Sequence, residues 1–242
     1  MTQHAAALSR RVFLVSSAAA CGGLMLGLAL PERAGAEGEG GATGAMVNNW
    51  IIIQKDNTII IRVARSEMGQ GSFTALPMLV CEELDCDWSK VKGEYASASD
   101  NLGNAFGSMS TGGSRAIRES QEMLRKAGAS AREMLLAAAA QKWGVKRSEL
   151  KAENSVITHI PTGRTMTYGE IAEAAAKLSP PAEVTLKDPK DWKLVGKAQA
   201  RFDIADKVMG RPVYGIDVRI PGMLYATLAQ CPVFGGKLAS YD

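Results

Sequence analysis

The chain has few side chains that bind metals. Its only histidines are His4 and His159. A metal site built on imidazole groups is therefore close to excluded, and we expect no metal ligands within the chain. His159 lies in a polar strand–turn segment and is expected at the surface.

Cysteine is also scarce. Cys21 falls in an apolar N-terminal segment, which leaves Cys81, Cys86 and Cys231. Their number is odd, and their spacings fit neither a zinc site nor a disulfide framework. Cys81 and Cys86 could open a plant-type iron–sulfur motif, but the next cysteine two residues on is missing. We therefore predict ordinary packing thiols.

An excess of charge is missing too. The formal net charge is +3, and residues 1–36 contribute three arginines against one glutamate, which leaves 25 basic and 24 acidic residues. This balance gives no electrostatic reason to expect a nucleic-acid partner. With 242 residues, 46% of them hydrophobic, the chain can bury a substantial core.

Residues 1–36 have the order of an export signal. Ser-Arg-Arg-Val-Phe-Leu at 9–14 is followed by an apolar stretch to Leu30 and by Ala-Gly-Ala at 34–36. Paired arginines, a hydrophobic region and a small-residue cleavage site predict the twin-arginine route in a bacterium. The expected location is the periplasm or the periplasmic face of the inner membrane. The alternative is an anchor, because 13–30 holds 18 uncharged residues.

After the leader, residues 37–46 read as a flexible linker, and a domain follows at 47–186. Its pattern predicts strands separated by helices. The expected strands are a hairpin at 50–54 and 58–64, a strand at 91–96, and a β-turn-β unit within 150–167. The expected helices are 74–84, 115–143 with core candidates Ile117, Met123, Leu124, Met134 and Leu135, and a third that begins at the capping box Thr167/Glu170 and runs to Leu178.

Beyond this domain the pattern changes. Residues 187–203 read as a second linker, and strand-like alternation is expected over 217–230. A further apolar run at 233–238 has no partner strands after it. We expect 204–242 to be the start of a domain, and the chain to be the N-terminal part of a longer or two-chain protein.

Two loops have residues suited to binding an anion. In Glu67-Met-Gly-Gln-Gly71, two glycines leave backbone N–H groups uncovered just before a helix; Ser110-Thr-Gly-Gly-Ser114 precedes the long helix in the same way. Neither matches the phosphate loop of nucleotide hydrolases or the dinucleotide-binding glycine pattern. A tight turn and a helix cap are the alternative interpretations.

Several segments together resemble a known family. They are EMGQGSFTALPMLVCEELDCDW, STGGS, LRKAGASAREMLLAAAAQKWGV, TGRTMTYGEIAEAAA and YGIDVRIPGMLYATLAQCPVFGGK. Residues 47–242 are similar to the N-terminal third of the large, molybdopterin-binding subunit of the xanthine oxidase and aldehyde oxidoreductase family, in its isoquinoline 1-oxidoreductase beta-subunit branch.

The resemblance implies an α+β fold of mixed sheets with packed helices, followed by the start of an α/β hammerhead domain. It implies a molybdenum–pterin cofactor, molybdopterin or its cytosine dinucleotide form. Gly69, Gln70 and Gly71 would contact the pterin. Gly112, Gly113 and Ser114 would hold its phosphate end. Ala116 stands where the family often has a small hydroxyl residue, so the phosphate contacts would be fewer.

The same resemblance implies an enzyme that oxidises aldehydes or N-heteroaromatics with water as the oxygen source. Electrons would pass to a small partner subunit carrying 2Fe–2S clusters, and a cytochrome c is a candidate acceptor. No catalytic residue is assigned here, because the family's catalytic glutamate lies in a later region that would belong to the remainder of the large subunit. Glu67 and the pair Glu82–Glu83 are weak acid–base candidates, with Glu83 expected to face solvent or make cap contacts.

Two other functions remain open. One is a truncated, non-catalytic fragment that acts at most as a binding or assembly module. The other is a periplasmic ligand-binding module whose glycine loops hold a simple anion. The first would be favoured by a true stop after Asp242, and the second by a protein without molybdenum.

Overall fold

The computed structural model describes residues 24–26, 50–101 and 104–241. The chain divides into two compact units between Ile204 and Ala205. Of the predicted leader, only 24–26 is described, and the predicted linker 37–46 lies outside the described residues. Among those residues, no helix combines the length and apolar character that crossing a bilayer requires.

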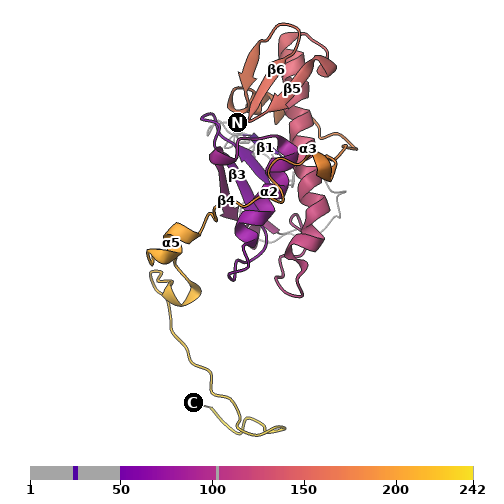
Figure 1. Cartoon of the computed structure of the whole chain (residues 1–242). Coiled ribbons are helices and arrows are strands. Elements are labelled where there is room, and N and C mark those ends of the chain that lie inside the picture. Colours follow the sequence, from indigo (N-terminus) through magenta and orange to yellow (C-terminus); the bar gives the residue numbers. More distant parts are fainter. Residues whose placement is uncertain (1–23, 27–49, 102–103, 242) are drawn as a thin grey trace, which may run out of the picture. The chain divides into compact units, whose positions relative to one another are not determined.

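The first unit is built around a four-stranded sheet in the order β1-β2-β3-β4 (Figure 1). Its strands are β1 (Leu24–Leu26), β2 (Ile51–Ile53), β3 (Ile59–Val63) and β4 (Val91–Tyr95). The first three pair antiparallel, whereas β3 and β4 are parallel. The parallel pair requires a crossover, and α2 (Ser72–Leu84) supplies it.

Two helices cover this sheet and close its core. The predicted long helix is α3 (Arg115–Trp143), which packs along α2. Gly128 of α3 makes the close approach possible, because a Cβ there would lie 2.4 Å from the carbonyl oxygen of Val80. The isoleucines of β2 and β3 supply the apolar floor, since Ile51, Ile53 and Ile59 are fully buried.

A smaller sheet follows α3. Its strands β5 (Leu150–Glu153), β6 (Val156–His159) and β7 (Thr165–Thr167) pair antiparallel in sequence order. The helix α4 (Tyr168–Ala175) begins at the predicted capping box, in which the Glu170 carboxylate accepts from the backbone N–H of Thr167. Short 3₁₀ turns lie at Trp88–Lys90, Ser99–Asn101, Arg147–Glu149 and Pro189–Asp191, and another lies at Gly215–Asp217 in the second unit.

The α+β class is confirmed, but three expectations of burial were wrong. Ile117, in the first turn of α3, is 37% exposed. His159 is buried instead of exposed, with its ring nitrogens facing the Thr162 hydroxyl and the Glu149 carboxylate. Glu83 is fully buried instead of facing solvent, because α3 and the segment 187–203 both bind it.

The segment 187–203 lies along α2. Near the C-terminus of α2, residues 187–195 bind its carboxylates, and near the N-terminus the backbone N–H of Phe202 donates to Thr74 Oγ1. Phe202 also stacks on Trp88, with ring centroids 4.8 Å apart. We call this segment the strap.

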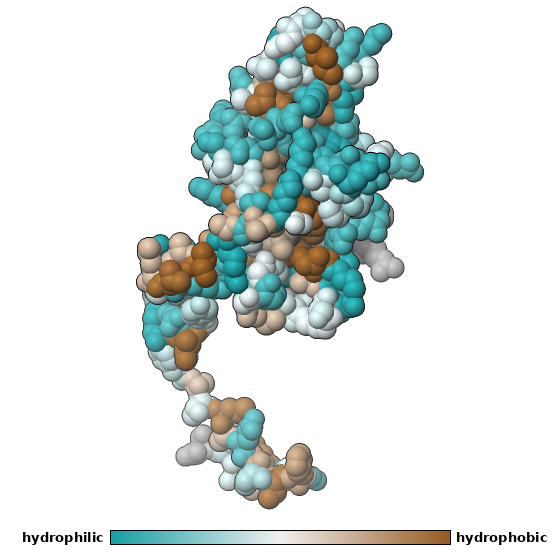
Figure 2. Space-filling model, viewed as in Figure 1, coloured by the Kyte–Doolittle hydropathy of each residue, from teal (hydrophilic) through white to brown (hydrophobic). Residues whose placement is uncertain are grey.

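The second unit covers residues 205–242 and contains the end of α5 (Ile204–Val208). The strand predicted within 217–230 was wrong: no residue of 218–241 is in a strand. A strand needs a neighbour to pair with, and here Ile220, Leu224 and Leu228 all stand exposed. Figure 2 shows brown, hydrophobic surface along this C-terminal segment.

Candidate functional site

The first loop is organised around the carboxylate of Glu67, whose side chain is 1% exposed. Its Oε1 accepts from the backbone N–H groups of Gly69 and Gly71, over 2.7 and 2.9 Å, and its Oε2 accepts from the N–H of Phe73 over 2.9 Å. A backbone concavity that would suit a bound anion therefore holds an anion of its own.

Gln70 also turns back into the loop. Its Oε1 accepts from the Met68 N–H over 2.6 Å, while its Nε2 donates to the Ser66 carbonyl and to Ser72 Oγ, both over 2.8 Å. The oxygen and the nitrogen of the Gln70 side-chain amide therefore both hold the loop in its conformation. Gln70 is thus a scaffold residue of the loop in this structure.

These contacts correct the interpretation of the first loop as an anion cradle. Its glycine N–H groups are not uncovered, because Glu67 lies close enough in sequence to fill them. What the glycines provide is space: Gly69 and Gly71 both have positive φ, and a Cβ at either would meet no atom within 4 Å. The loop presents bare backbone that a flat ligand could approach closely.

Glu67 is held as a carboxylate by its partners. Burial opposes its ionisation, but the N–H donors of Gly71, Phe73 and Gly69 and the charge of Arg201 outweigh that cost, so the pKa of Glu67 lies below its ordinary value. Arg201 lies 3.2 Å from Glu67 and also donates to the Gly69 carbonyl over 3.0 Å. The strap therefore clamps the loop.

The second loop leads into the N-terminus of α3. Gly112, Gly113 and Ser114 are exposed, and Gly113 and Ser114 have left-handed backbones. Within the described part of the chain, no acceptor binds their backbone N–H groups. These donors, unlike those of the first loop, are free to meet a ligand.

The charge around this helix start also suits an anion. The first turn of α3 has no acidic residue, whereas Arg115 and Arg118 lie in it. Their guanidinium groups reach the carbonyls of Gly112 and Gly113 over 3.3 and 3.4 Å. Cations at a helix N-terminus oppose the helix dipole, so a negatively charged ligand would relieve the repulsion.

The structure brings the two loops together. The backbone N–H of Ser66 donates to Thr111 Oγ1 over 2.8 Å. Arg65, which is buried, donates through Nη1 to the Ser110 carbonyl and through Nε to Ser120 Oγ over 3.4 Å. Sequence reasoning proposed both loops but did not find the residues that join them, because no local pattern marks a contact across 45 residues.

The third acidic feature, Glu82 with Glu83, anchors the strap. Glu82 Oε2 accepts from the backbone N–H groups of Lys193, Leu194 and Val195, over 3.0, 2.7 and 3.0 Å. Burial opposes its ionisation, yet these N–H donors and the Lys187 ammonium hold the pKa of Glu82 below its ordinary value. Glu82 is therefore a carboxylate that anchors the strap.

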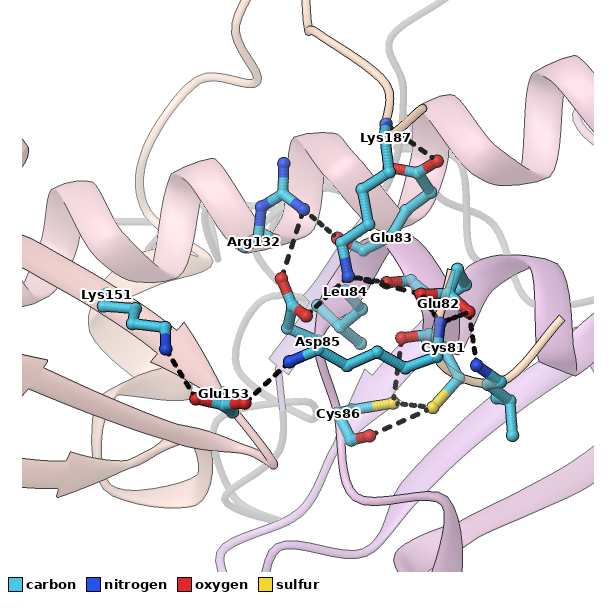
Figure 3. Close-up of polar contacts among 12 residues, drawn as sticks. Cys81, Glu82, Glu83, Leu84, Asp85, Cys86, Arg132, Lys151, Glu153 and Lys187 are labelled. Carbon is cyan, nitrogen blue, oxygen red and sulfur yellow. Dashed lines mark hydrogen bonds and ion pairs between the residues drawn. The ribbon is translucent and has the colours of Figure 1, made fainter. Parts of the chain in front are cut away.

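Glu83 belongs to the same anchor (Figure 3). Its carboxylate accepts from the backbone N–H of Lys187, as Figure 3 shows. It also accepts from Arg125 Nε over 2.8 Å. The Lys187 ammonium in turn reaches Asp85 Oδ1 over 2.5 Å. The carboxylates of Glu82 and Glu83 therefore hold the strap against α2. Among the residues that the structure describes, no group of His, Cys, Asp and Glu could hold a metal ion.

Comparison with known proteins identifies the family. The family model for the molybdopterin cofactor-binding domain matches residues 27–208. The chain belongs to this family. The resemblance to the molybdopterin-binding subunits of the xanthine oxidase family is thereby confirmed, as is the molybdenum–pterin cofactor.

Among its relatives is the beta subunit of isoquinoline 1-oxidoreductase of Brevundimonas diminuta, 35% identical, with 94% of this chain and 34% of the relative covered. A membrane-bound aldehyde dehydrogenase (pyrroloquinoline-quinone) of Gluconacetobacter polyoxogenes is 31% identical, with 98% and 31% covered. The B subunit of nicotinate dehydrogenase of Pseudomonas putida is 29% identical, with 77% and 15% covered. The chain spans about a third of the length of the first two relatives.

A solved structure that matches part of the chain is that of Cu,Mo-CO dehydrogenase in its carbon monoxide reduced state. It is 20% identical, with a TM-score of 0.44, and the match covers 59% of this chain and 18% of that chain.

The free backbone donors and open glycine positions described above fit the molybdopterin group. A planar pterin can approach the bare backbone at Gly69 and Gly71, and a phosphate suits the N–H donors at Gly112, Gly113 and Ser114.

Proposed function

We propose that this chain forms one wall of the cofactor site in an exported molybdenum hydroxylase, an oxidoreductase acting on aldehydes or N-heteroaromatic compounds. The observation that carries the proposal is the hydrogen bond from Ser66 to Thr111, which joins two glycine loops into one surface. When bound, the molybdenum–pterin group would supply the redox centre at which oxygen from water reaches a substrate carbon.

The chain's own residues would bind and orient that group. Gly112, Gly113 and Ser114 would donate backbone N–H bonds to its phosphate end, with Arg115 adding positive charge. At the other loop, Gly69 and Gly71 would admit the pterin because neither carries a side chain. Gln70 and Glu67 would hold that loop in shape. We assign no catalytic residue in this chain.

The rest of the proposal concerns the whole protein. We propose that electrons leave through a small subunit carrying 2Fe–2S clusters, with a cytochrome c as a candidate acceptor. Support comes from two relatives that are each named as one subunit of a larger enzyme. The twin-arginine pattern at 9–14 supports export to the periplasm or its membrane face. The motifs after Asp203 support the start of a hammerhead domain.

The test is molybdenum and pterin content of the purified complete enzyme carrying Gly112→Ala. Gly112 has no positive φ, and a Cβ there would meet nothing within 4 Å, so the variant should fold normally. A ligand packed on that loop would instead collide with the methyl group. We expect severalfold lower molybdenum per protein.

Gly215→Ala is the matched control, because this glycine is equally open and lies in the second unit. It should retain full molybdenum content. Equal molybdenum content in both variants would show that the second loop is not part of the cofactor site. Absence of molybdenum and pterin from the unmodified complete enzyme would overturn the proposed function itself.

A further inference from the structure

The C-terminus of α2 places two thiols against each other. The helix ends at the left-handed residue Asp85, with φ of 55°. The backbone N–H groups of Asp85 and Cys86 both turn back to the carbonyl of Cys81. In this type of helix ending, the residue after the left-handed one packs on the residue in the last turn. Here those two positions are Cys86 and Cys81.

The side chains follow the backbone. The Sγ atoms of Cys81 and Cys86 lie 2.6 Å apart, and both residues are buried (Figure 3). Cys81 Sγ also donates to the carbonyl of Cys86 over 3.2 Å. A disulfide requires about 2.05 Å between sulfurs. The two sulfurs therefore lie near bonding distance in the folded chain.

We propose that Cys81 and Cys86 are a redox modification site, at which they join in an intrachain disulfide that closes the turn 82–85. Each thiol gives up one hydrogen, and the S–S bond forms. The two electrons pass to a disulfide oxidant such as oxidised glutathione, which leaves as two thiols.

The turn enclosed by this bond is the one that anchors the strap. Glu82, Glu83 and Asp85 all lie between the two cysteines, and all three bind Lys187. Unwinding the last turn of α2 would separate these carboxylates. A disulfide across the turn resists that unwinding, so the oxidised chain should release its strap less often than the reduced chain.

The reaction would be slow in the closed fold. Burial, followed by the contact with Cys81, raises the pKa of the Cys86 thiol well above its ordinary value. Because the thiolate is the attacking species, exchange must await local opening of the helix end. Cys231, by contrast, is exposed in the second unit and should react with any thiol reagent in the folded chain.

The test is peptide mapping of the purified full chain after incubation with oxidised or reduced glutathione. The chain is then unfolded in guanidinium with excess N-ethylmaleimide and digested with trypsin. Residues 66–90 form one tryptic peptide that contains both cysteines, and 220–237 forms another that contains Cys231. Each peptide is counted for maleimide labels.

After oxidation we expect the 66–90 peptide without label, and lighter by two hydrogen atoms than its reduced, unlabelled form. After reduction it should carry two labels. Two labels after oxidation would overturn the proposal, as would a glutathione adduct or a link to Cys231 in place of the internal bond. A Cys231→Ser variant should oxidise at 66–90 just as the unmodified chain does.

Limited trypsin digestion of the folded chain tests the role of the bond. Cleavage after Lys190 in the strap should be at least about fivefold slower in the oxidised chain, a factor that corresponds to about 1 kcal/mol. In Cys86→Ser the two redox conditions should give the same rate. Equal rates in the oxidised and reduced unmodified chain would show that the disulfide does not secure the strap.

Discussion

The backbone N–H of Ser66 lies 2.8 Å from Thr111 Oγ1, and this single contact connects the two loops that the sequence places 45 residues apart. Thr111→Val removes the acceptor while keeping a branched side chain of similar size. We expect a loss of about 1 kcal/mol in unfolding free energy. A loss of this size should leave the complete enzyme folded. Its molybdenum content per protein should nevertheless fall, because the two loops are no longer joined.

The control for this variant is Thr165→Val on β7, an exposed threonine outside the loops. It should leave molybdenum content unchanged. If Thr111→Val also retains full content, the hydrogen bond does not govern cofactor retention.

Glu67→Gln should destabilise the first loop. The glutamine side chain has one acceptor oxygen, and its NH₂ group would face N–H donors now bound to Oε1 or Oε2. It also loses the ion pair to Arg201. We expect urea denaturation to show a loss of roughly 2–3 kcal/mol, as for buried hydrogen bonds to a charged group. Glu183→Gln, an exposed control, should change stability by less than about 0.5 kcal/mol.

Stability should fall in acid because of Glu82. Its pKa is lower in the folded chain than the unfolded value of about 4.3, so the unfolded state binds protons first as the pH falls. The contribution of Glu82 is fully present above that unfolded value and is lost as the pH falls through the lower, folded-state pKa.

Urea denaturation at a series of pH values between about 7 and 3 measures this effect. Glu82→Gln should be less stable at neutral pH, and its stability should fall less steeply below about pH 4.3. The exposed Glu183→Gln should keep the steep fall. If the unfolding free energy of Glu82→Gln falls with pH as steeply as that of the unmodified chain, other carboxylates cause the acid effect.

Gly128→Ala should separate α2 from α3. The new Cβ would lie 2.4 Å from the Val80 carbonyl oxygen. A backbone atom cannot move aside as easily as the end of a flexible side chain. We expect a loss of about 1–3 kcal/mol in urea denaturation, despite the better helix propensity of alanine. Gln141→Ala, at an exposed position of the same helix, should stay within about 0.5 kcal/mol. A Gly128→Ala chain as stable as this control would mean that the helices can move apart without cost.

Local patterns predicted the elements of the first unit well. The long helix was expected at 115–143 and is observed over that range, because its capping glycine and its helix-forming residues are local signals. The hairpin of β2 and β3 was likewise marked by isoleucine runs on both sides of Lys-Asp-Asn. The capping box at Thr167 correctly marked the start of α4.

What the sequence did not reveal depends on distant partners. Nothing near Glu82 indicates that the N–H groups of Lys193 and Leu194 will meet it 111 and 112 residues later. The hydrogen bonds of the Glu67 carboxylate within the first loop could have been predicted locally. An acidic residue two positions before a glycine turn can accept hydrogen bonds from the backbone N–H groups of that turn. The alternation after Asp217 failed for the opposite reason, because a strand pattern without a pairing partner does not form a strand.

The burial of Glu82 also sets an order of events during synthesis. A nascent chain that ends before Lys187 has none of the donors that fill the carboxylate of Glu82, and the ribosome must add more than a hundred residues before they exist. Until then, closing α2 against its surroundings would leave a carboxylate without partners, which is costly. The end of α2 must therefore stay hydrated until the strap has been synthesised, and it can close only then.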